Sequence, residues 1–171
     1  MAQVTPREDS PGFEVSGTTR SPMATFRVGE RLGEALGPGD VVALVGELGA
    51  GKTELARGIC RGAGVREAEV SSPSFAIVAT YLGRIPVHHA DLYRLADEDE
   101  LYGTGWQDLF GGEGVVLVEW ADRLPGALPA QRLEIRLAHD DRFRSVRHIR
   151  ALGIGARHAQ LAQRLAASFP A

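Results

Sequence analysis

A glycine-rich segment between two apolar stretches has the residue types needed to bind phosphate. It reads Gly-Glu-Leu-Gly-Ala-Gly-Lys-Thr over residues 46–53 and fits the pattern G-x-x-x-x-G-K-[ST] at every fixed position. Glycines allow backbone conformations that are closed to other residues, so that successive N–H groups can face one anion. Lys52 supplies a compact positive charge for the β- and γ-phosphates, and the Thr53 hydroxyl is a hard oxygen ligand for Mg²⁺.

Lys52 is the only lysine in the chain, and the other eighteen basic residues are arginines. A planar guanidinium cannot replace a slim ammonium inside a closed loop. The retention of lysine at this one position therefore favours a phosphate-binding loop over a chance glycine turn.

The segments around the loop are those that such a site requires. The apolar run 41–45 predicts a buried strand, and residues 54–60 carry apolar side chains at helical spacing. The helix start adds unpaired N–H groups and the positive end of its dipole.

Besides the Thr53 hydroxyl, P-loop enzymes hold Mg²⁺ with a carboxylate at the end of a neighbouring strand, and such a carboxylate is expected here. Glu119 ends the apolar run 115–119, and Asp91 ends a more mixed strand. Both acids remain candidates, because acids also cap elements and form salt bridges. Trp120 could stack on a base or a partner, or simply pack. Only one of His88 and His89 can face the site, because successive strand residues point to opposite faces.

Ser72 and Ser74 follow the loop helix and could meet the γ-phosphate or Mg²⁺, as switch loops do. A turn organised by Pro73 is the alternative.

The remaining pattern predicts one α/β domain over residues 21–171: a P-loop NTPase domain with a mixed central β-sheet flanked by helices. Ser21 and Pro22 are typical of a helix cap and first helical position. Residues 75–81 and 85–93 predict a hairpin, residues 133–137 and 144–152 an antiparallel pair, and residues 156–169 a final helix. Residues 1–20 are polar and rich in Gly, Ser, Thr and Pro, which predicts a disordered extension.

The composition of the chain indicates its expected cellular location. No apolar run approaches the roughly 20 residues of a membrane span, and no secretory signal begins the chain. The single cysteine, Cys60, is expected to be buried in a reducing compartment. We therefore expect a cytoplasmic protein.

Residues 1–131 hold 11 basic and 19 acidic side chains, whereas residues 132–171 hold 8 and 3. This basic end predicts either an anionic partner or a solvated arginine-rich surface.

Four motifs together resemble the TsaE (formerly YjeE) family of small bacterial P-loop ATPases. They are the segment 46–53, Ser-Pro-Ser-Phe at 72–75, His-Ala-Asp-Leu-Tyr-Arg-Leu at 89–95 and Val-Glu-Trp at 118–120, in the family's order. The resemblance covers residues from about 21 to 150. It implies an ATPase subunit for N6-threonylcarbamoyladenosine at position 37 of ANN-decoding tRNAs, acting with TsaB and TsaD. It thus implies contact with tRNA through that complex, and no membrane.

The resemblance also implies roles for particular residues. Lys52 and Thr53 would serve phosphate and Mg²⁺, Glu119 would be a second Mg²⁺ contact, and Asp91 a further active-site acid. ATP would also be contacted near Ser21 and Thr25, at Trp120 and around Phe143 and Arg144. Ser74 stands where the family usually has threonine, which leaves its role open. The loop residues that would bind the nucleotide are Gly46, Glu47, Leu48, Gly49, Ala50, Gly51, Lys52 and Thr53.

Two other functions stay open from the residues alone. A small-molecule kinase shares the strand, loop and helix but needs an acceptor site, for which we find no motif. A non-catalytic nucleotide sensor would let ATP order loops for a partner, and the presence of both Asp91 and Glu119 argues against it.

Overall fold

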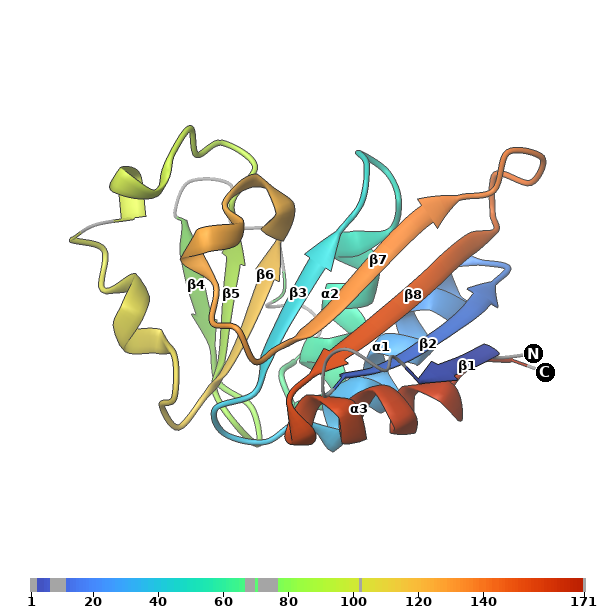
Figure 1. Cartoon of the computed structure of the whole chain (residues 1–171), viewed down its shortest axis with the longest axis horizontal. Coiled ribbons are helices and arrows are strands. Elements are labelled where there is room, and N and C mark those ends of the chain that lie inside the picture. The colour runs from blue at the N-terminus through green and yellow to red at the C-terminus, as the bar shows by residue number, and fades with distance from the viewer. Residues whose placement is uncertain (1–2, 7–11, 67–69, 71–76, 102, 171) are drawn as a thin grey trace.

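The computed structural model describes residues 3–6, 12–66, 70, 77–101 and 103–170. Their strands form one eight-stranded sheet in the order β1-β2-β8-β7-β3-β6-β5-β4 (Figure 1). The middle strands β7, β3, β6 and β5 run parallel. β4 pairs antiparallel with β5 and β8 with β7, and beyond β8 the strands β2 and β1 each pair antiparallel with the strand before them in the sheet. The predicted mixed α/β sheet is therefore confirmed.

The strands at the centre of the sheet are those that the apolar runs predicted. β3 is Val41–Val45 and β6 is Val115–Glu119, and every residue of both is buried. Parallel strands covered on both faces show this continuous apolar pattern. Flanking them are β5 (Val87–Asp91), β4 (Val78–Tyr81), β7 (Leu133–His139) and β8 (Arg147–Ile154).

The prediction of disorder for residues 1–20 is wrong for the part that the structure describes. Gly12–Thr19 forms β2, which pairs with the whole of β8, and Gln3–Pro6 forms the edge strand β1. The inward positions of β2 include Val15, Gly17 and Thr19, of which only Val15 is a strongly apolar strand former. The strand was missed because this period-2 signal is weak, and its partner lies about 130 residues away in sequence.

Three helices cover the sheet, and each begins close to where it was predicted. α1 is Pro22–Ala35, α2 is Lys52–Gly62 and α3 is Ala156–Ala166. Ser21 caps α1, because its side chain accepts a hydrogen bond of 3.1 Å from the Ala24 N–H. None of the helices that the structure describes is long and apolar enough to cross a membrane.

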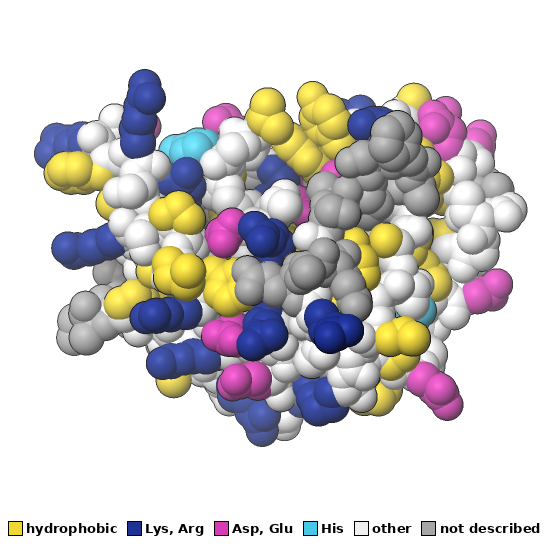
Figure 2. Space-filling view, turned by 180° about the vertical axis from the view of Figure 1, so that it is seen from behind, with side chains coloured by type: hydrophobic (Ala, Val, Ile, Leu, Met, Phe, Trp, Pro, Cys, Tyr) yellow, Lys and Arg dark blue, Asp and Glu magenta, His cyan; other side chains and the backbone are white. Residues whose placement is uncertain are grey.

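α1 and α2 touch along their backbones rather than through side chains. A methyl group added at Gly29, Gly33, Gly58 or Gly62 would overlap a backbone carbonyl of the other helix. Glycine allows this close approach because it carries no Cβ. On the outer surface of the pair, arginines are interspersed with acids (Figure 2), including Arg57 near Glu54 and Arg61 near Glu30.

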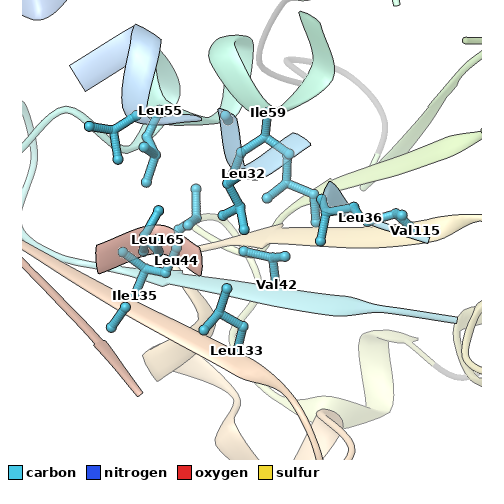
Figure 3. Packing of buried hydrophobic residues seen from close by; sticks show 14 of the residues in the cluster. Leu32, Leu36, Val42, Leu44, Leu55, Ile59, Val115, Leu133, Ile135 and Leu165 are labelled. Carbon is cyan, nitrogen blue, oxygen red and sulfur yellow. The ribbon is translucent and has the colours of Figure 1, made fainter. Parts of the chain in front are cut away.

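The core lies on both faces of the central strands. On one face, side chains of the three helices pack on the sheet (Figure 3): Leu32, Leu36, Leu55, Ile59 and Leu165 lie over Val42, Leu44, Val115, Leu133 and Ile135. On the other face, short 3₁₀ turns at Glu98–Leu101, Trp106–Leu109, Ala121–Arg123 and Pro125–Ala127 cover the sheet. Both faces of β3 and β6 are thus covered by packed side chains. This packing holds in place the ends of these two strands, where the site lies.

Candidate functional site

The glycine-rich loop joins the end of β3 to the start of α2, as predicted. Gly46, Gly49 and Gly51 have φ angles of 152°, 77° and 101°. These values lie in the region that L side chains rarely adopt, so each glycine is required by its backbone conformation. Gly51 precedes α2, which begins at Lys52. The helix therefore directs its free N–H groups and positive end at the loop.

Lys52 is folded back onto its own loop. Its Nζ donates hydrogen bonds to the carbonyl oxygens of Gly46 and Glu47, the latter at 2.8 Å, and only 4% of the residue is exposed. Burial lowers the pKa of this ammonium group, an effect that the nearby charges of Glu119, Asp122 and Asp91 oppose. A phosphate group that enters the loop would offer anionic oxygens in place of these neutral carbonyls. Anionic oxygens bind a cation more strongly.

Trp120 covers the ammonium group of Lys52. Nζ lies 3.6 Å from the centre of the indole ring, which is a cation–π contact. The Trp120 φ angle is 58°, the one positive value at a non-glycine position in the described part of the chain. Backbone conformations of this kind cost about 1–3 kcal/mol and concentrate at functional sites. The Tyr93 ring also packs against the indole of Trp120, with 4.8 Å between the ring centroids.

Glu119 and Thr53 meet at the end of β6. The Thr53 hydroxyl donates a 3.0 Å hydrogen bond to Glu119 Oε2, although the residues are 66 positions apart. The other carboxylate oxygen, Oε1, lies 2.9 Å from Nε2 of His89, and the side chains of His89 and Glu119 are 0% and 2% exposed. The carboxylate is thus held at both oxygens.

Asp91 lies beside Glu119, because the two residues are partners in the parallel register of β5 and β6. Its Oδ1 accepts a 2.9 Å hydrogen bond from the Tyr93 N–H. Of the two acids that the sequence left open, Glu119 is the one that hydrogen-bonds to the loop threonine.

These groups surround a single cavity of about 290 Å³. It is lined by Leu48, Gly49, Gly51, Lys52, Thr53, Asp91, Tyr93, Glu119 and Trp120. The cavity brings together loop backbone, a cation, a hydroxyl and two carboxylates. This combination suits an anionic ligand that arrives with a divalent cation.

The donor set fits magnesium. Thr53 and Glu119 provide hard oxygen atoms, and the described residues contain no cluster of three or more His, Cys, Asp or Glu side chains able to hold a metal. Mg²⁺ is usually held by one or two carboxylates together with substrate phosphates and water, rather than by an all-protein cage.

Several predicted contacts lie at the same edge of the sheet. Thr19, at the end of β2, is in register with Arg147 of β8, which brings the start of α1 close to the β7–β8 hairpin. Thr25 is 1% exposed and its hydroxyl lies 2.7 Å from that of Thr19, so in this conformation it stabilises the helix start. A nucleotide contact at Ser21 or Thr25 stays a prediction. Ser74 and the segment 72–75 lie outside the described residues.

The β7–β8 hairpin reaches the loop through residues other than the predicted Arg144. Arg147 donates to the carbonyl oxygens of Gly49 at 3.3 Å and of Arg144, and His139 Nε2 lies 3.4 Å from the Leu48 carbonyl. The Arg144 side chain is exposed at the hairpin tip, so its contact with a nucleotide also stays a prediction. No local pattern marked Arg147 or His139, because only the strand register brings them to the loop.

Four of the eight arginines of the basic end form ion pairs with acidic side chains of the protein. Arg150 binds Glu14 at 2.8 Å, Arg157 binds Asp40 at 2.6 Å, and Arg132 and Arg136 share Glu134. Whether the remaining arginines contact an anionic partner stays a prediction.

Fold and site together define a P-loop protein of the α/β class, in which a glycine-rich loop joins a central strand to the start of a helix. The family described as "Threonylcarbamoyl adenosine biosynthesis protein TsaE" matches residues 19–149. The chain therefore belongs to the TsaE family, as its motifs indicated.

Individual relatives agree with this assignment. The "tRNA threonylcarbamoyladenosine biosynthesis protein TsaE" of Bacillus subtilis is 38% identical over 150 residues, covering 86% of this chain and 90% of that protein. The protein of the same name from Treponema pallidum is 40% identical over 119 residues, covering 70% and 87%. The crystal structure of Bacillus subtilis YdiB is similar over 96% of this chain and 97% of its own, with a TM-score of 0.72 and 30% identity.

Proposed function

We propose that this protein is a magnesium-dependent, ATP-hydrolysing subunit for the formation of N6-threonylcarbamoyladenosine at position 37 of ANN-decoding tRNAs. It acts in the cytoplasm with the TsaB–TsaD complex and contacts tRNA only through that complex. The names of its relatives support the pathway, since they describe tRNA threonylcarbamoyladenosine biosynthesis proteins.

One observation carries the chemistry: the hydrogen bond between Thr53 of the loop and the buried carboxylate of Glu119. It joins the two oxygen donors that a nucleotide-bound Mg²⁺ needs from the protein. The magnesium ion, when bound, would neutralise charge on the β- and γ-phosphates. Lys52 would exchange its carbonyl partners for phosphate oxygens.

Asp91 is the second acid that lines the cavity, and it lies beside Glu119 in the register of β5 and β6. We assign it to the orientation of the attacking water, a task that a carboxylate beside the metal site can perform. Trp120 and Tyr93 would shield the phosphates from bulk water, which strengthens the electrostatic interactions in the cavity.

The test is a reconstituted modification reaction with purified TsaB, TsaD, tRNA and ATP, with and without this protein. We expect slow ATP hydrolysis by the protein alone, a changed rate with the TsaB–TsaD pair, and repeated rounds of modification only when it is present. The Lys52→Ala variant should lose nucleotide binding and fail to support these rounds.

Each alternative gives a different result in the same reactions. A phosphorylated nucleoside or metabolite would indicate a kinase, and tight ATP binding without phosphate release would indicate a sensor. Either outcome, or modification that does not depend on the protein, would refute the proposal.

A further inference from the structure

His89 lies in the middle of β5, and its ring contacts the Glu119 carboxylate. Its partner in the register of β5 and β6 is Leu117, two residues before Glu119 on the same face of the sheet. A ring at this diagonal position can reach the carboxylate, and the observed Nε2–Oε1 distance is 2.9 Å. His88 points to the opposite face, where its Nδ1 lies 2.9 Å from the Thr80 hydroxyl.

The contact determines which way the Glu119 carboxylate is turned. An ionised carboxylate only accepts hydrogen bonds, so Nε2 of His89 carries the proton and donates it to Oε1. With Oε1 held, the second oxygen is directed at the Thr53 hydroxyl. Without that N–H, the terminal torsion of the glutamate is broad and the carboxylate can rotate away from Thr53.

The histidine is a poor choice for packing alone. It is fully buried, and its Nδ1 has no hydrogen-bond partner among the described residues. A buried polar atom without a partner destabilises the fold, whereas an apolar ring in the same space carries no such penalty. The benefit that offsets this cost is the N–H donated to Glu119.

We propose that His89 is the positioning residue of this site, which fixes the Glu119 carboxylate against Thr53 so that both are placed to hold a nucleotide-bound magnesium ion. This inference rests on the proposed function. Partners of this kind behind a metal ligand change metal affinity by about 10- to 100-fold when they are removed.

Two substitutions separate positioning from packing. His89→Phe keeps an aromatic ring but has no donor, and His89→Gln keeps an N–H donor but has no ring. His88→Phe is the matched control, because it makes the same change on the opposite face of the same strand. For each protein, the affinity for a fluorescent ATP analogue is measured in EDTA and across a Mg²⁺ titration, together with the thermal unfolding midpoint.

We expect all three variants to bind the analogue in EDTA within about twofold of the wild type. Magnesium should increase the affinity for the analogue. The Mg²⁺ concentration that gives half of this increase should be about 10-fold higher for His89→Phe than for the wild type. His89→Gln should recover most of that loss, and His88→Phe should match the wild type.

A different ranking of the variants by their Mg²⁺ requirement would overturn the inference. If His89→Phe responds to Mg²⁺ like the wild type, the donated N–H has no role. If the Phe variant is less impaired than the Gln variant, or both lose stability and EDTA affinity together, His89 is a packing residue. If the wild type itself shows no magnesium-dependent binding, the proposed function fails as well, which distinguishes that failure from one of His89 alone.

Discussion

Replacing Gly58 by alanine tests whether the loop helix is held in place by backbone contact. Gly58 lies in the middle of α2 and faces α1. A methyl group there would overlap the carbonyl oxygen of Phe26 and lie 2.9 Å from its carbonyl carbon and 3.0 Å from the Glu30 nitrogen. These are backbone atoms, which cannot rotate aside as a side chain can, so the helices must separate.

The expected cost follows from two opposing effects. Extra methyl groups in a packed interior cost about 1–3 kcal/mol, and backbone obstacles place Gly58 at the upper end of that range. Alanine in place of glycine returns up to about 1 kcal/mol through helix propensity. The net loss is about 2 kcal/mol, which for a chain of this size lowers the unfolding midpoint by roughly 4–8 °C.

Thermal and urea unfolding followed by circular dichroism measure this loss. Gly37→Ala is the control, because an added Cβ meets nothing closer than 3.6 Å there; it should be neutral or stabilising by up to about 1 kcal/mol. Since α2 begins at Lys52, the Gly58 variant should also bind nucleotide more weakly while still folded. A Gly58→Ala protein as stable as the wild type would refute backbone contact between the helices.

Three further predictions concern single side chains. Glu119→Ala should bind nucleotide in EDTA like the wild type yet lose about 100-fold or more in magnesium-dependent ATP turnover; unchanged turnover in a phosphate-release assay would exclude Glu119 as a metal contact. Burial, with a smaller effect from Glu119, raises the pKa of Cys60 to about 12, so a thiol reagent at pH 8 should react only after unfolding, and rapid reaction of the native protein would contradict the buried position. Burial lowers the pKa of His158 from its ordinary 6.5, and its Nε2 accepts from the Val41 N–H. The unfolded chain therefore takes up the proton first, so stability is complete above about pH 6.5 and falls below it. His158→Gln should lose less unfolding free energy than the wild type between pH 8 and pH 5.5 in urea titrations, and equal losses would argue against this role.

The sequence predicted those parts of the site that are local. Residues 46–53 form the loop at the end of β3, and Glu119 ends β6, because glycine conformation and apolar runs are determined by neighbours along the chain. The Ser21 cap was predictable for the same reason.

Contacts that depend on strand register were not predictable. His89 reaches Glu119, and Arg147 reaches Gly49, only because particular strands lie side by side. Tyr93 lies in the 89–95 motif, but its place in the cavity was not predicted, and neither was the effect of the Asp122 charge on Lys52. β2 shows the same limit at the level of the fold, since its partner strand comes near the end of the chain.

The stacking of Trp120 on Lys52 gives the protein its own optical reporter. The chain has two tryptophans, and Trp106 is buried beneath the 3₁₀ turns, where its indole N–H donates to the Ala127 carbonyl. Trp120 instead lies 3.6 Å from the Lys52 ammonium group, which under the proposed function would exchange its carbonyl partners for phosphate oxygens. Intrinsic fluorescence should therefore follow occupancy of the loop without any label, with Trp106 as a constant background.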